Sequence, residues 1–118
     1  MLLFFLACSA SNIEMVSQKE TFIVVRETVD FPLNEEFEFV FTLLDTARSP
    51  ITPEDVVVDA EMPAHGHGMG QTPTTTNIDN LYTSTGMLFA MEGDWDIHIY
   101  VTEDGSVDQA TYSDVCCE

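Results

Sequence analysis

The stretch EEFEFVFTLLD, residues 35–45, is the clearest indication of the fold. Apolar and polar side chains alternate along it, and an extended chain would carry on one face Phe37, Phe39, Phe41 and Leu43. The opposite face would carry Glu36, Glu38 and Thr42. Because successive side chains of a β-strand point to opposite sides of the sheet, this period of two predicts a strand with one buried face.

Patterns of the same kind recur on both sides of this stretch. Runs of β-branched and apolar residues predict further strands over 21–27, 56–62, 81–91, 95–101 and 107–112. Turn-forming residues separate these runs at 49–55, 92–94 and 103–106. The turn EGD at 92–94 predicts a hairpin between strands 81–91 and 95–101. The polar stretch QTPTTTN, residues 71–77, is assigned to no strand.

About seven short strands in one 118-residue domain favour an all-β fold. We expect an immunoglobulin-like antiparallel β-sandwich, and a small β-barrel is the alternative that periodicity leaves open. The predicted core consists of the residues on the apolar side of each strand: Phe37, Phe39, Phe41, Phe89, Trp95, Ile97 and Ile99.

The first twelve residues, MLLFFLACSASN, resemble the signal of a bacterial lipoprotein. Their apolar run is too short to span a bilayer, which takes about 20 residues. We expect a leader over residues 1–8 with Cys8 as the lipidated residue, a tether over 9–20, the sandwich over 21–113 and a tail over 114–118. No Lys or Arg precedes the apolar run, so either the leader begins upstream or the resemblance is accidental.

The charge of the chain restricts its partners. Twenty-one acidic residues against three basic ones give a formal net charge of -18. Such a surface repels nucleic acid and attracts cations and basic partners, so we expect no nucleic-acid binding. We also expect no enzyme, because no Ser-His-Asp arrangement, phosphate-binding loop or isolated pair of carboxylates is recognisable.

Two of the three histidines lie in the segment EMPAHGHGMG, residues 61–70. His65 and His67 are separated by one residue, so in an extended backbone their side chains point the same way and can converge on one ion. Met62 and Met69 flank them and are candidate thioether ligands, Met62 the first of them. Imidazole and thioether together are ligands that suit copper, and the segment contains no cysteine, which disfavours a structural zinc site.

The segments MPAHGHGM and LYTSTGMLFAMEGDWDIHIYV resemble the YtkA-like domain, a small extracytoplasmic β-sandwich of bacterial lipoproteins related to FixH. The resemblance covers roughly residues 21–112. It implies a link to copper and cytochrome oxidase assembly, and a copper site at one end of the sandwich made by Met62, His65, His67 and Met91.

Other interpretations of these residues remain open at this stage. A histidine pair in a Gly-rich loop can simply cap backbone groups, and Met91 can be core filler, since it shares an apolar face with Phe89. His98 alternates with Ile97 and Ile99 and is expected to face outward. The adjacent pair Cys116 and Cys117 is too close for an ordinary disulfide and is expected to be either an inert tail or a soft-metal or redox site.

The function predicted from the sequence is an extracytoplasmic copper-binding domain that holds or delivers copper. Its expected partners are the metal ion, an envelope protein and, if Cys8 is lipidated, the membrane through that anchor. The alternative is an envelope interaction module that binds no metal.

Overall fold

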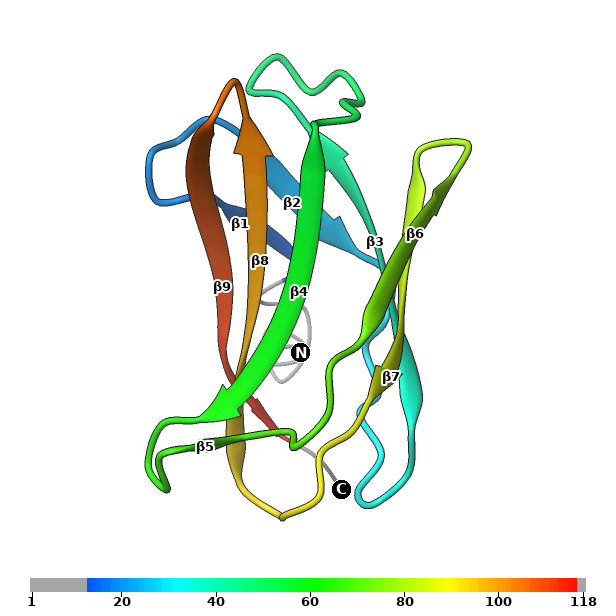
Figure 1. The fold of residues 1–118 in the computed structure, drawn as a ribbon, viewed down its shortest axis with the longest axis vertical. Helices are drawn as coiled ribbons and strands as arrows, with labels where there is room; N and C mark the ends of the chain where they lie inside the picture. The colour runs from blue at the N-terminus through cyan, green and yellow to red at the C-terminus, as the bar shows by residue number, and fades with distance from the viewer. Residues whose placement is uncertain (1–12, 117–118) are drawn as a thin grey trace, which may run out of the picture.

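Two antiparallel sheets pack face to face in the computed structural model, which describes residues 13–116 (Figure 1). The five-stranded sheet has the order β1 (Glu14–Val16), β2 (Ile23–Arg26), β3 (Phe37–Leu44), β7 (Leu81–Met87) and β6 (Thr74–Ile78). The four-stranded sheet has the order β5 (His67–Gly68), β4 (Asp55–Met62), β8 (Asp94–Glu103) and β9 (Ser106–Cys116). The prediction of an all-β antiparallel sandwich is confirmed, and the described residues contain no helix long and apolar enough to cross a bilayer.

The core lies between the sheets and is built by the alternation that the sequence displays. Along β3 the burial follows the period of two, with Phe39, Phe41 and Leu43 buried and their neighbours more exposed. The predicted core residues Phe89, Trp95, Ile97 and Ile99 are buried, and Phe37 is partly buried against them. The pattern predicts the core because a strand of either sheet has only its inner face covered.

The predicted hairpin between residues 81–91 and 95–101 is wrong. β7 ends at Met87 and belongs to the five-stranded sheet, whereas β8 lies between β4 and β9 in the other one. The connection over 88–93 therefore crosses from one sheet to the other. Phe89 lies within this connection and is buried in the core. The apolar residues of the connection therefore resemble the continuation of strand 81–87.

Three strands were not expected from the sequence. β1 lies within the segment 9–20 assigned to a tether, and it pairs with β2. β5 has two residues, and β6 forms within the polar stretch 71–77 and beyond it. β9 continues past residue 113 to Cys116. The leader over 1–8, Cys8 and Cys117 lie outside the described residues.

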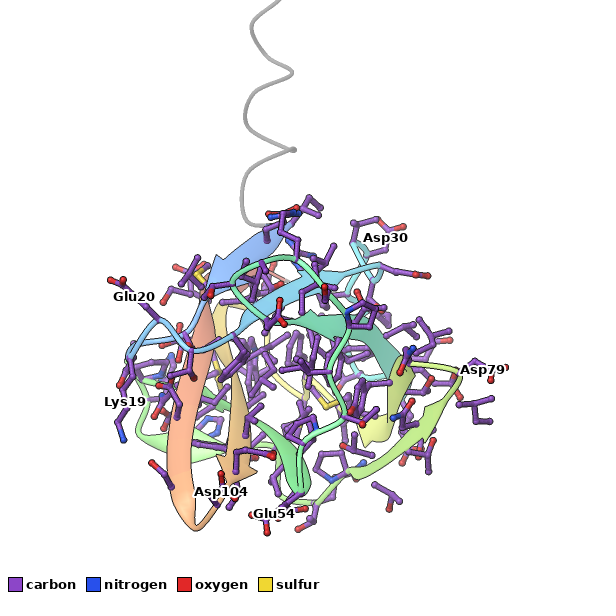
Figure 2. The ribbon with its side chains drawn as sticks, turned by 90° about the horizontal axis from the view of Figure 1, so that it is seen from above. Lys19, Glu20, Asp30, Glu54, Asp79 and Asp104 are labelled. Atoms are coloured by element: carbon purple, nitrogen blue, oxygen red, sulfur yellow. The ribbon has the colours of Figure 1, made fainter. Side chains whose placement is uncertain are left out.

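Two tight hairpins stand out at the edges of the sandwich. Asp79 and Asn80 join β6 to β7, and Asp104 and Gly105 join β8 to β9, all four with positive φ. Positive φ at both loop residues matches the twist of the paired strands. Asp79 and Asp104 mark the two tips in Figure 2.

Candidate functional site

The histidine segment is a short hairpin at the end of β4. Met62 pairs with His67 and Glu61 with Gly68, and residues 63–66 form the loop between them. The carbonyl oxygen of Met62 accepts hydrogen bonds from the backbone N–H groups of His65 and Gly66, at 3.1 and 2.9 Å. Gly66 has a φ of 65°. These bonds give the loop a defined conformation, so both histidines are presented from an ordered turn.

His65 and His67 are both exposed, and their ring centres lie 6.0 Å apart. With metal–nitrogen bonds of about 2 Å, two imidazoles that share one ion have ring centres no more than about 6.5 Å apart. The separation lies within this limit, which is reached when the two nitrogens lie on opposite sides of the ion, so a shared ion would hold the rings at a wide angle. His67 Nδ1 lies 3.1 Å from the carbonyl oxygen of Gly68, which can only accept a hydrogen bond. That contact favours the tautomer with a proton on Nδ1, which leaves the lone pair of Nε2 for a metal.

The three methionines of the predicted ligand set differ in exposure. Met62 is 1% exposed and Met69 is 6% exposed, so both belong to the core. The Met69 sulfur also accepts a hydrogen bond from the backbone N–H of Leu88, at 3.4 Å. Met91 is 42% exposed, which overturns its interpretation as core filler. The strand on which that interpretation relied ends at Met87, four residues earlier.

Trp95 connects the histidine hairpin to the segment that carries Met91. The His67 and Trp95 rings meet edge to face, with centroids 5.9 Å apart. The indole N–H donates a hydrogen bond of 2.9 Å to the carbonyl oxygen of Met91, and the ring stacks on Phe89 at 4.7 Å. Because Trp95 is fully buried, it is a rigid support. It holds an exposed imidazole and the backbone of an exposed methionine at the same end of the sandwich.

That end also receives the end of β9. Cys116 is the strand partner of Asp94, which directly precedes Trp95. Figure 1 shows the β4–β5 hairpin, the 88–93 connection and the end of β9 together at the bottom of the molecule. Residues that are far apart in the sequence are therefore brought to one end of the sandwich.

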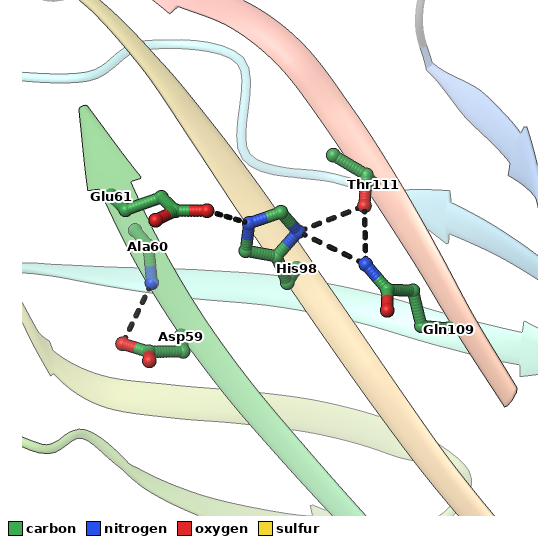
Figure 3. A network of polar contacts seen from close by, with 6 residues as sticks. All are labelled: Asp59, Ala60, Glu61, His98, Gln109 and Thr111. Carbon is green, nitrogen blue, oxygen red and sulfur yellow. Dashed lines mark hydrogen bonds and ion pairs between the residues drawn. The ribbon is translucent and has the colours of Figure 1, made fainter. Parts of the chain in front are cut away.

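His98 lies on the outer face of the four-stranded sheet, as expected, but it is not simply solvated. Its side chain is only 13% exposed. Nε2 lies 2.8 Å from a Glu61 carboxylate oxygen, and Nδ1 lies 2.8 Å from the Thr111 hydroxyl, which accepts a further hydrogen bond from Gln109 (Figure 3). Both ring nitrogens are thus engaged by protein groups. Sequence reasoning missed this network, because His98 and its partners come from three strands.

Conventional metal ligands do not gather at this end in large number. Within residues 13–116, no three side chains of His, Cys, Asp or Glu are grouped so that they could hold a metal ion. A metal bound at the hairpin would rely on the two imidazoles together with ligands of another kind, such as a thioether.

Comparison with known proteins gives one family. A family model described as YtkA-like matches residues 14–100, which includes β1 to β7 and most of β8. No curated protein and no solved structure matches the chain.

Proposed function

The chain belongs to the YtkA-like family, and we propose that it binds one copper ion at the β4–β5 hairpin and holds or delivers it outside the cytoplasm. The observation that carries the proposal is the exposed pair of imidazoles, with ring centres 6.0 Å apart on a turn fixed by its own backbone hydrogen bonds. Two nitrogen ligands on an ordered turn cost less conformational entropy on binding than two on a mobile loop would.

Met91 is the thioether best placed to complete the site. It is exposed, and its carbonyl oxygen is tied to the indole that also contacts His67. Met62 and Met69 would have to leave the core to reach an exposed ion, which would forfeit buried apolar surface. Two imidazoles and one thioether form a small, soft set of ligands, which favours copper(I) over zinc or magnesium.

An exposed ion with few protein ligands suits the transfer of cargo. A partner can approach an open coordination position and replace the ligands one at a time. We propose an envelope protein as the recipient, in oxidase assembly or copper homeostasis, and a lipid anchor at Cys8 as the means that keeps the domain at the membrane.

The test is a copper(I) titration of the full chain against a chromogenic chelator of known affinity. We expect binding of one ion by the wild type, and a loss of at least a hundredfold in affinity in the His65→Ala, His67→Ala double variant. Both side chains are exposed, so circular dichroism should show that the variant stays folded. His98→Gln is the matched control, since it removes the remaining histidine, and it should keep the wild-type affinity.

Two results would overturn the proposal. If the double variant binds copper as tightly as the wild type, the hairpin is not the site. If the wild type binds no copper at micromolar concentration, the chain is better described as an interaction module of the envelope.

A further inference from the structure

Charge is distributed very unevenly along this chain. It has 21 acidic and 3 basic residues, yet Asp79 alone among them lies between Met62 and Met91. That segment forms β5, β6 and β7. One side of a strongly acidic molecule is therefore nearly free of charge, and β6 is the strand at its edge.

β6 also differs from the other outermost strands in how its edge is protected. β1 has three residues and β5 has two, and β9 is interrupted by a register shift and has the Gln109 carbonyl occupied by the N–H of Gln18, at 2.8 Å. β6 has five residues in unbroken register with β7. Natural edge strands are usually blunted by charge, bulges or shortness, and Thr74–Ile78 contains none of these.

The free edge of β6 borders a cleft of about 220 Å³ whose opposite wall is the start of β4. Thr75, Thr76 and Asn77 line one side of it, and Glu54 and Asp55 line the other. A strand added to β6 would pass this cleft beside Thr75, Thr76 and Asn77. Its backbone would meet the edge of β6, and its side chains would meet two carboxylates.

We propose that β6 binds an extended segment of a partner protein that carries lysine or arginine side chains. Main-chain hydrogen bonds to an exposed edge supply affinity in strand addition, and side-chain contacts supply specificity. The basic character follows from the acids beside the edge, Glu54 and Asp55 across the cleft from Thr75–Asn77 and Asp79 at the hairpin tip, within a chain of net charge -18. The same charges oppose a second copy of this chain, which would bring its own acids to the edge.

The proposal is tested on the full chain with the synthetic peptide acetyl-TKVKVKT-amide, observed by backbone NMR. We expect it to shift the amide signals of Thr74–Ile78 and to slow their hydrogen exchange. A peptide with N-methyl groups at alternate residues cannot pair along one edge and should not do so. The peptide TEVEVET should bind far more weakly, and added salt should weaken the lysine peptide.

Glu54→Gln with Asp55→Asn is the informative variant, and it should weaken the lysine peptide by about threefold to tenfold. Glu20→Gln with Asp30→Asn changes the net charge equally, and Figure 2 shows both of these residues well away from Glu54. This control should change the affinity less than twofold.

Several outcomes would overturn the proposal. Binding that survives N-methylation would mean that no strand is added. Equal weakening in the two double variants would indicate attraction by net charge alone. Protection of β6 amides that grows with protein concentration, without peptide, would assign the edge to a second copy of the chain.

Discussion

The methyl carbon of Met62 packs against Gly93 so closely that a β-carbon added to the glycine would lie only 2.6 Å from it. Gly93 also has a φ of 141°, which side chains rarely adopt. The end of β4 and the connection before β8 are therefore packed against each other without room for one more carbon atom. The contact joins the histidine hairpin to the segment that carries Met91.

We predict that Gly93→Ala destabilises the fold by about 1–3 kcal/mol, from backbone strain and from displacement of Met62. Urea unfolding monitored by circular dichroism measures this. Gly105→Ala is the control, because Gly105 has a φ of 75° but nothing within 4 Å of the added carbon, so only the strain of about 1 kcal/mol remains. Equal costs for the two variants would show that the contact with Met62 contributes nothing.

Copper binding should quench the fluorescence of Trp95, which is the single tryptophan of the chain and touches the His67 ring. The quenching should saturate at one equivalent of copper and should disappear in the His65→Ala, His67→Ala variant. A saturable signal that persists in this double variant would place the metal elsewhere. Because the indole is buried, collisional quenching by free copper should be small.

Substitution of an exposed methionine should affect copper binding, and substitution of a buried one should affect stability. Met91→Leu should weaken copper(I) binding by about tenfold while leaving stability nearly unchanged, since an exposed side chain is replaced. Met69→Leu should leave copper affinity unchanged and cost about 1 kcal/mol, because the Leu88 N–H loses its acceptor. Chelator competition and urea unfolding of both variants provide the measurements. The reverse pattern would assign the thioether ligand to Met69.

Asp108 should make the fold sensitive to acid. Burial opposes ionisation of this carboxyl, but hydrogen bonds from Ser17, Thr21, Lys19 and Gln109 outweigh burial and lower its pKa to about 2. Because this pKa is lowered, the ionised carboxyl contributes its full stabilisation at pH values above the ordinary pKa of 3.8. The contribution disappears as the pH falls through about 2. Its size at neutral pH is about 2 kcal/mol.

The variant Asp108→Asn tests this dependence. We expect the free energy of unfolding of the variant to lie below that of the wild type at pH 7, with a difference that shrinks steadily between about pH 4 and pH 2. Urea unfolding at each pH measures the difference. A difference that stays constant with pH would show that the charge of Asp108 is not what stabilises the fold.

Arg26 is a buried cation whose aromatic contacts should matter. Its guanidinium lies 5.0 Å from the centre of the Tyr112 ring and 5.5 Å from that of Phe31, and it donates a hydrogen bond to the Thr28 carbonyl. Arg26→Lys keeps the charge but loses the planar stacking, and we expect a cost of about 1–2 kcal/mol in urea unfolding. Arg48→Lys is the control, because Arg48 forms an exposed ion pair with Glu14 and should tolerate the change. Equal effects would contradict the prediction.

The sequence predicts the sandwich and its core because alternation reports directly which strand face is covered. It predicts the turn at Asp104 and Gly105, since Asp-Gly is a strong hairpin signal. It misses β6 because a run of threonines has no apolar face, and because Asp79-Asn80 is a weaker signal than Asp-Gly. β6 forms because it pairs with β7, which is itself held in the sheet by β3.

The residue types of the candidate site could be predicted from the sequence, but not how deeply each side chain is buried. Spacing alone places His65 and His67 on one turn, and the structure brings their rings within reach of one ion. The period of two in β4 places Met62 on the covered face with Val58 and Ala60. Spacing does not reveal that Met91 turns outward, because the strand that would cover it ends at Met87. The network around His98 depends on strand order, which no local pattern contains.

The scarcity of charge on β6 and β7 also gives the molecule an electric dipole. Its negative pole lies among the acids of the other strands, and the opposite pole lies on the side of these two strands. Near a negatively charged surface, such as an anionic lipid bilayer, the field exerts a torque that turns the acids away and the β6–β7 side inward. Salt limits this field to about 8 Å at physiological ionic strength, so the orientation is biased only as the protein comes close to such a surface.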